Sequence, residues 1–565
     1  MNNLKEEQTP SWVPAGMMAA AVVALLGCEA AKYQQAADDE VYHILSQRSQ
    51  EVLGQSEKHD IATDLTEREP QDVNGTEIIL DRFNNQEGRL VTLPEALALA
   101  VKSNRTYQFN REKLYLSALN LTGTRHRFAF KFTGASTDVG VTRGTDGGLD
   151  GSSNGSVTLN KLLKAGGSIT TSLANDLVLY FDGKPKVPSL TMNLTQPLLR
   201  GAGTDIATEV LTQAERNVVY EVRDFSRFQK TFATGVVNDY LGLLQQADSM
   251  RIAYNNYTNR IYFQLETDAR VQGGLMAEFD AKQTQQQVYS AKISYISSTN
   301  SFQNSLDDFK QKLALPLGTP IRLDLKLLDA INQLGLPAVS VTDQEGYYMA
   351  ITNRLDFLNN IDRFEDSKRK VRVARQDLLP SLSFIADASL KDQFYSSFQP
   401  ENYSATLKMK LDLPLDQLSE RNAYRTSLIN FERQVRTLAT ELDQLRDGIR
   451  TNVRNLERQR QSYFTQEQAL ANAEQSVLAT TLRMRLGLPG IRTKDIIDAQ
   501  TALTSAQQAL SKALIDYHKT RLNLLLDVGQ LDTTQEQFWL KAGAGPVAPP
   551  EALDNVVPPT QILGQ

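Results

Sequence analysis

Two carboxylates, Asp495 and Asp498, form the pattern in this sequence that most suggests chemistry. Residues three apart lie on one face of a helix, so both side chains can point into the same space. Arg492 stands just before the pair, and Asp280 occupies the matching place in an earlier turn of the chain. Clustered carboxylates attract cations, but acidic residues are also favourable at any solvated helix start. The pair alone leaves both interpretations open.

No pattern in the sequence indicates covalent catalysis. The histidines are scattered without metal-ligand spacing, at His43, His59, His126 and His518. No nucleophile motif, phosphate-binding loop or dinucleotide fingerprint follows a predicted strand. A Gly- and Asp-rich loop over residues 144–155 offers Asp146 and Asp150 as calcium ligands, although a solvated surface loop has the same composition. We therefore expect neither an enzyme nor a cofactor, and no metal.

The single cysteine, Cys28, ends an apolar run that begins at Met17. This run has the length of a signal peptide and is too short to span a bilayer as a permanent helix. Its last residues, Leu25-Leu26-Gly27-Cys28, resemble the bacterial lipobox, in which the cysteine thiol is acylated. We expect a signal peptide over residues 1–27 and lipidation of Cys28. The alternative is a signal peptide that happens to contain a cysteine.

Charge gives no reason to expect a nucleic-acid partner. The net charge of -6 is small for 565 residues, and lysines and arginines are interspersed with acidic residues along the chain. After the N-terminal run, no apolar stretch is long enough for a transmembrane helix.

The aspartates lie beside one of two similar turns. Residues 270–280 contain Gly273-Gly274-Leu275, and residues 485–495 contain Gly487-Leu488, each between two long helical patterns. Working back, a long helix-compatible run begins at Pro197-Leu198 in one copy and at Pro414-Leu415 in the other. A strand-like alternation precedes each pair. This order of elements, with a period far longer than that of ordinary solenoids, indicates an internal duplication.

Long coiled-coil helices are predicted by apolar residues that recur every seven positions. After Pro414 they are Leu428, Val435, Leu442, Ile449, Leu456, Tyr463, Leu470 and Val477. The first copy starts in the same way and then shifts by four residues, which predicts local unwinding. The returning helix of the second copy has an alanine-rich seam that permits close packing, formed by Ile496, Ala499, Leu503, Ala506, Leu510, Ala513 and Tyr517.

Apolar and polar residues alternate strictly between Tyr403 and Leu413. Leu407 and Met409 fall on one face, and Lys408 falls on the other. An outer-membrane strand needs this pattern, with lipid on one side and water on the other, but a half-buried soluble hairpin shares it. In the first copy, residues 157–163 and 168–173 indicate an additional hairpin. The number of strands per chain is therefore four or six.

In this order, the elements resemble those of the TolC-type outer-membrane efflux proteins, in a lipoprotein variant. The resemblance covers residues 91–530. It is carried by the helix start Leu93-Pro94-Glu95, the junction Thr195–Gly201, the strand start Leu379–Ser383 and the two turns, the second of which is followed by Asp-x-x-Asp. The departures are the additional hairpin, a second turn that is longer by two residues, and a long N-terminal tether.

The resemblance implies an α+β membrane protein. Three chains would form an outer-membrane β-barrel of 12 or more strands, continuous with a long periplasmic α-helical coiled-coil barrel. The expected domains are a signal peptide over 1–27, a lipidated tether over 28–90, structural repeats over 91–330 and 331–530, and a flexible Pro-rich tail over 531–565.

The implied function is that of a passive exit duct in a tripartite efflux or type I secretion system, which carries small molecules or polypeptides across the periplasm and outer membrane. The implied partners are two further copies of the chain, a periplasmic adaptor, an inner-membrane pump of the RND, ABC or MFS type, and outer-membrane lipid. The alternative is a structural coiled-coil lipoprotein of the outer membrane that conducts nothing.

By the same resemblance, the two turns form the periplasmic tip. Gly274, Leu275, Gly487 and Leu488 would be the surface on which the adaptor docks. Asp495, Asp498, Arg492 and Asp280 would form the periplasmic gate, with Arg492 paired to Asp280 or Glu278.

Overall fold

The computed structural model describes residues 30–56, 59–66, 68–83, 88–143, 149–176, 189–391, 403–488, 490–535 and 537–541. The predicted signal peptide, Cys28 and most of the predicted tail lie outside these residues. The described residues divide into two compact units. The first unit draws on Met1–Ile61, Lys113–Val222 and Pro380–Leu413, and the second on Ala62–Glu112, Arg223–Leu379 and Pro414–Gln565. Each unit thus combines segments from both halves of the sequence.

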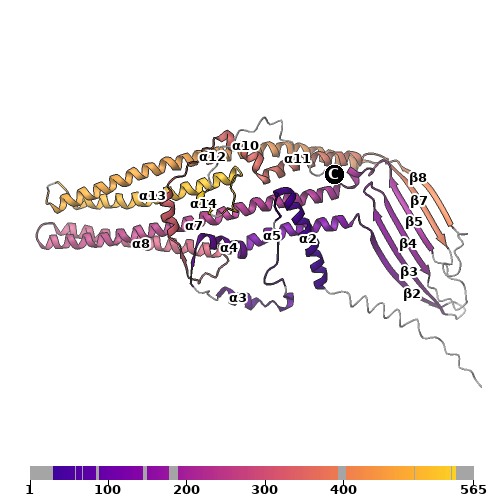
Figure 1. Ribbon diagram of the computed structural model, residues 1–565, viewed down its shortest axis with the longest axis horizontal. Helices are drawn as coiled ribbons and strands as arrows, with labels where there is room; N and C mark the ends of the chain where they lie inside the picture. Colours follow the sequence, from indigo (N-terminus) through magenta and orange to yellow (C-terminus); the bar gives the residue numbers. More distant parts are fainter. Residues whose placement is uncertain are drawn as a thin grey trace, which may run out of the picture. The chain divides into compact units, whose positions relative to one another are not determined.

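A six-stranded antiparallel sheet dominates the first unit (Figure 1). Its strands are, in spatial order, β2 (Lys131–Arg143), β3 (Leu149–Leu162), β4 (Ser168–Asp176), β5 (Ser189–Pro197), β7 (Ser381–Lys391) and β8 (Tyr403–Asp412). The additional hairpin predicted from the sequence is β3 and β4, so the chain contributes six strands to this sheet and not four. Residues 149–155, predicted as loop, belong to β3, where Asp150 pairs with Thr142 of β2; Asp146 lies outside the described residues.

One face of the sheet is apolar. The register sets Leu407 of β8 beside Ala386 of β7, and Ala386 beside Leu194 of β5. Leu407 is 72% exposed, so no other element of the described chain covers this face there. Side chains of this kind need an apolar surrounding, which the described part of the chain does not supply.

The other face of the sheet is polar. Asn193 of β5 donates a hydrogen bond to Asp387 of β7, and the Nζ atom of Lys408 lies 3.4 Å from the same carboxylate. Farther along, Thr158 of β3 and Ser172 of β4 are hydrogen-bonded at 3.1 Å. The alternation predicted for Tyr403–Leu413 is therefore part of a polarity difference that extends from the described side chains of β3 to β8.

Helix α2 (Ala30–Leu53) of the first unit packs on α5 (Arg105–His126), and α6 (Thr204–Ala207) follows β5. The hydroxyl of Tyr115 on α5 donates to Asp38 on α2 at 2.6 Å. Ser49, also on α2, is hydrogen-bonded to His59 at 2.8 Å. The segment predicted as a tether thus contains an ordered helix.

Two long helical hairpins extend through the second unit (Figure 1). In the first, α7 (Glu209–Gln272) is followed by α8 (Glu278–Lys312), and in the second, α12 (Leu418–Arg485) is followed by α13 (Thr493–Asp527). With a rise of 1.5 Å per residue, α12 is about 100 Å long. No helix in the described ranges has both the length and the apolar composition needed to cross a membrane.

Burial along the second hairpin follows the predicted heptads. The buried residues of α12 are Leu445, Ile449, Leu456, Ala473 and Met484. Ile449 and Leu456 are predicted seam positions, and Met484 lies one heptad beyond Val477. On α13, Ile496, Ala499, Ala506, Ala513 and Tyr517 are buried, as its alanine-rich seam predicts. The coiled-coil prediction is confirmed for this hairpin.

The remaining elements of the second unit are shorter, and two of its helices begin in the same way. They are η1 (Pro70–Asp72), α3 (Gly75–Phe83), β1 (Arg89–Val91), α4 (Leu93–Ser103), β6 (Ile321–Leu323), α9 (Lys326–Leu334), α10 (Asp343–Asn353), α11 (Leu355–Gln376) and α14 (Phe538–Lys541). Strands β1 and β6 pair in parallel. Both α4 and α10 begin with a capping box, formed by Thr92 with Glu95 and by Thr342 with Glu345.

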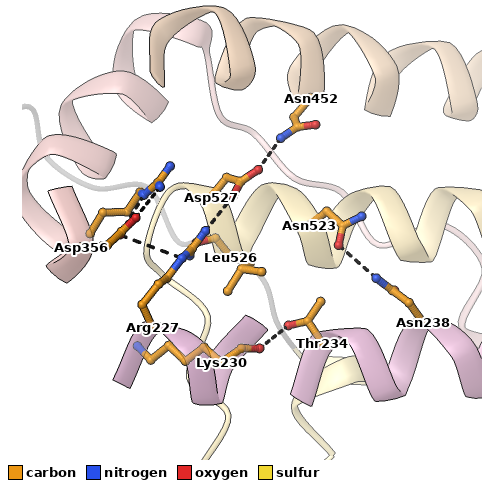
Figure 2. Close-up of polar contacts among 10 residues, drawn as sticks. Arg227, Lys230, Thr234, Asn238, Asp356, Asn452, Asn523, Leu526 and Asp527 are labelled. Atoms are coloured by element: carbon orange, nitrogen blue, oxygen red, sulfur yellow. Dashed lines mark hydrogen bonds and ion pairs between the residues drawn. The ribbon is translucent and has the colours of Figure 1, made fainter. Parts of the chain in front are cut away.

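A polar cluster joins α7 to the end of the second hairpin (Figure 2). Arg227 of α7 donates to the carbonyl of Leu526 in the last turn of α13 and, at 2.9 Å, to the carboxylate of Asp527. Asn452 of α12 donates to the other oxygen of Asp527 at 2.6 Å. A cation at the C-terminal end of a helix is favourable for the helix dipole. The cluster therefore fixes the C-terminal end of α13 against α7 and α12.

Candidate functional site

The two turns predicted as the tip have the same backbone geometry. In the first, the N–H of Gly274 donates to the carbonyl of Val271 at 3.0 Å, and that of Leu275 donates to Arg270 at 2.8 Å. In the second, Gly487 donates to Met484 at 3.2 Å and Leu488 donates to Arg483 at 3.1 Å. Gly274 has φ 72° and Gly487 has φ 66°, which other residues rarely adopt. Each long helix therefore ends in a Schellman motif.

The leucine that follows each of these glycines is exposed. Leu275 is 76% exposed and Leu488 is 49% exposed. In a Schellman motif the residue after the glycine often packs back on the helix end, and here both leucines remain largely uncovered. The two turns thus present apolar side chains that no part of the described chain buries.

Asp495 and Asp498 lie in the first turns of α13, as predicted. The carboxylate of Asp495 accepts the backbone N–H of Arg492 at 2.8 Å, so it caps the helix start. The guanidinium of Arg492 is 82% exposed, and its Nε lies 3.9 Å from the same carboxylate. Asp498 is exposed one turn further on. Within one chain, Asp495 has a structural role whatever else it does.

The predicted pairing of Arg492 with the facing turn does not occur within the chain. Asp280 and Glu278 lie in the first turn of α8. Among the described residues, neither forms an ion pair with Arg492, whose neighbouring carboxylate is Asp495. The start of α13 is held instead by residues of α7 that were not predicted as site residues from the sequence.

A buried arginine, Arg260 on α7, holds the start of α13. Its Nη2 donates to the carbonyl of Ile497 at 3.1 Å and to the hydroxyl of Thr501 at 2.8 Å. The residue is 3% exposed, and its Nη1 has no hydrogen-bond partner among the described residues. Burial lowers the pKa of Arg260, and the charge of Asp498 acts in the opposite direction. Asp498 therefore serves as a nearby counter-charge for Arg260.

Three further residues on the same side of α7 complete this contact. Phe263 packs with Met484, Ile496 and Ile497. Arg270 donates to Glu266 at 3.1 Å and to the carbonyl of Met484 at 3.4 Å. Arg485 of α12 lies 3.8 Å from Glu266. We call Arg260, Phe263, Glu266 and Arg270 the tip link, because they join α7 to both helices of the second hairpin close to its turn.

The sequence contains a pattern from which the tip link could have been predicted. Its four residues follow one another at spacings of three or four, so they share one side of a helix. Two arginines and a glutamate on a side that faces another helix indicate polar bonds between helices. Such bonds inside a packed interface are stronger than those at the surface. The arrangement can hold the second hairpin in one position and release it when the bonds are exchanged.

The second half of the chain matches a known protein family. Residues 346–530 match the family model described as "Outer membrane efflux protein". These residues contain α11, β7, β8, α12 and α13. No curated protein sequence matches the chain.

Solved structures with the same fold include several channels. The outer-membrane channel OprN is 14% identical, with a TM-score of 0.58 over 78% of this chain and 90% of that chain. CusC is 12% identical, with a TM-score of 0.57 over 77% of this chain and 92% of that chain. The Campylobacter jejuni CmeC outer membrane channel is 13% identical, with a TM-score of 0.56 over 78% and 87%. At these identities the similarity establishes the fold.

Proposed function

Because residues 346–530 match the family of outer membrane efflux proteins, we propose that the chain is a passive exit duct in the outer membrane, part of a tripartite efflux or type I secretion system. The observation that carries this proposal is the sheet of the first unit, with one exposed apolar face and one polar face. Lipid suits the apolar face and a water-filled lumen suits the polar face. A structural coiled-coil lipoprotein would account for the long helices but has no use for such a sheet.

The duct is a trimer in this proposal. Strands β2 and β8 are the two edge strands of the described sheet, so each has one side without a neighbouring strand. Native proteins normally cover such edges. A stripe of apolar side chains on α8, Tyr289, Ile293 and Ile296, is likewise exposed. Neighbouring copies would cover both the strand edges and the helix stripe, closing a β-barrel and a helical barrel.

The exposed leucines of the two turns support a docking role. An apolar tip is a suitable contact for the helical hairpin of a periplasmic adaptor, which in turn binds the inner-membrane pump.

We expect Leu275→Glu combined with Leu488→Glu to abolish export while trimers still form, because the change places charge where apolar contact is needed. Export assays and native electrophoresis measure the two properties. As a control, Gln272→Glu with Lys494→Glu alters exposed polar residues beside the same turns and should leave export intact. Normal export by the leucine variant contradicts docking at this surface.

Asp495 and Asp498 would form the gate. Three copies around an axis would bring six carboxylates together, which a cation can neutralise.

In planar bilayers we expect the wild type to have a low conductance that divalent cations block. We expect these cations to block the variant with Asp495→Asn and Asp498→Asn more weakly. The amide still accepts the Arg492 N–H, so the helix cap is retained while the charge is lost. Asp443→Asn with Asp447→Asn, at exposed positions on α12, removes equal charge and should leave block unchanged. If the variant with Asp495→Asn and Asp498→Asn is still blocked by divalent cations as strongly as the wild type, the constriction lies elsewhere.

A further inference from the structure

The hairpin β3–β4 continues both faces of the sheet up to the last residues before its turn, where Lys161, whose Nζ lies over the ring of Phe130, stands opposite Ile169 on the apolar side. On the apolar side, Val157 of β3 stands opposite Leu173 of β4, and Leu159 stands opposite Thr171. On the polar side, Thr158 stands opposite Ser172 and Asn160 opposite Thr170. β4 then pairs with β5 over seven residues, from Ser168 with Thr195 to Ala174 with Ser189. The hairpin therefore has the same two-sided character as β5, β7 and β8.

The turn of this hairpin is fitted into the junction between β5 and α6. Gly166 has φ 91°, and a Cβ atom there would lie 2.4 Å from the carbonyl oxygen of Gly201. A Cβ at Gly167 would lie 2.3 Å from the side-chain oxygen of Gln196, whose Nε2 donates to the carbonyl of Ala165 at 3.1 Å. Only glycine permits this close approach. The hairpin is thus built into the sheet at its base and is not a loose insertion.

The directions of the strands permit closure. All five neighbouring pairs in the order β2-β3-β4-β5-β7-β8 are antiparallel. With an even number of alternating strands, β2 and β8 run in opposite directions, so β8 of one copy can pair antiparallel with β2 of the next. Three copies of a six-stranded sheet then close a ring of eighteen strands.

We propose that β3 and β4 are part of the barrel wall and that the duct therefore has an eighteen-stranded, water-filled lumen for bulky hydrophilic cargo. This inference rests on the proposed function. Barrel diameter increases roughly in proportion to strand number, so the lumen is about 1.5-fold wider than one built without the hairpin. On the polar face of the hairpin, the lining is hydroxyl and amide groups from Thr158, Asn160, Thr170 and Ser172. This part of the wall is uncharged, and Asp387 and Lys408 on the polar face of β7 and β8 carry opposite charges, so the lumen suits large hydrated solutes of either sign.

Deleting the hairpin tests its place in the wall. In the full-length chain, removal of residues 149–176 deletes β3 and β4 together, so β2 can pair antiparallel with β5 and the alternation of directions is retained. The remaining segments 144–148 and 177–188 supply the connection. Both proteins are reconstituted in planar bilayers, and polyethylene glycols of graded size probe the strand end of the channel. We expect the largest polymer that lowers conductance to be about 1.5-fold wider for the wild type than for the deletion.

The outcomes separate this inference from the proposed function. An equal size limit for the two proteins overturns the inference while leaving a conducting duct, and so does a larger limit for the deletion, which would place the hairpin inside the lumen as a plug. If the wild type does not conduct at all, the proposed function itself fails.

Cysteine labelling keeps the inference testable if the deletion does not fold. In a Cys28→Ser background, a water-soluble maleimide should label Thr158→Cys and Thr170→Cys on the polar face. It should label Val157→Cys and Leu173→Cys at least tenfold more slowly, because lipid covers that face. Equal labelling of both pairs in membranes means that the hairpin is outside the wall and overturns the inference. The same four variants in detergent-denatured chains should react equally, which controls for intrinsic reactivity.

Discussion

Replacing Leu407 with lysine is expected to prevent most of the chain from assembling in the outer membrane. Leu407 is on the apolar face of β8, opposite Ala386, and is largely exposed in the chain. A lysine that faces lipid near mid-depth costs roughly 2 to 4 kcal/mol. Because every copy carries the change, a closed trimer would bear it three times. The fraction of protein recovered as folded trimer from outer membranes, measured by native electrophoresis, should fall at least tenfold.

The neighbouring residue supplies a matched control. Thr406 precedes Leu407 and points to the opposite face, where its partner in the register is Asp387. A lysine at this position would face water beside a carboxylate, so Thr406→Lys should assemble almost as well as the wild type. The two variants differ by one position and have the same net charge. Equal assembly of the two would mean that the apolar face does not contact lipid, and would favour a soluble sheet.

Features set by neighbouring residues were predictable from the sequence. Gly274 and Gly487 adopt a positive φ that the sequence marks by glycine at the end of a helical pattern. The heptads of α12 and the strand β8 follow from periods of seven and two, which need no knowledge of the rest of the fold. The capping box of Thr92 with Glu95 is a local feature of the same kind. These elements are the ones for which local propensity and tertiary packing agree.

The strand number was not decidable because the pattern in the first copy is weak. Residues 149–155 are rich in glycine and serine, which favour loops. They are nevertheless in β3, paired with β2 along their whole length. Pairing with a neighbouring strand overrides a weak local preference. Residues 157–163 and 168–173 predict the hairpin from the sequence, but only the register shows that its polar and apolar faces continue those of β5, β7 and β8.

The contacts of the gate were harder to predict for a different reason. The sequence places Arg492 beside a turn, but its bonding depends on how α7 lies along α12 and α13. The apolar pattern of neither helix determines how far one helix is shifted along the other. A seam that repeats every seven residues matches its partner again after each shift of one heptad. The structure aligns the helices so that Arg260 of α7 bonds to the start of α13, while Arg492 lies near Asp495 of its own helix. Polar bonds of this kind fix the alignment that the apolar seam leaves open.

We expect Arg260→Met to raise conductance strongly. The variant keeps a long side chain in the buried position but loses both hydrogen bonds to Ile497 and Thr501. Hydrogen bonds to charged groups contribute roughly 1.5 to 3 kcal/mol in buried sites. If the bonds exist only in the closed state, their loss shifts the balance toward the open state by about tenfold to a hundredfold. Single-channel recordings measure the open fraction, and hydrogen exchange around Ile497 measures the release of α13.

Arg492→Met is the matched control, because it removes the same charge from a side chain that is 82% exposed and lies near Asp495 alone. An exposed pair of this kind is worth at most about 1 kcal/mol, so its loss should change the open fraction little. A larger effect for Arg492→Met than for Arg260→Met would contradict the tip link as the closing contact. It would indicate instead that Arg492 bonds to a neighbouring copy. The comparison thus decides whether closure is held within each chain, where one buried arginine joins two hairpins, or between chains at the exposed turns.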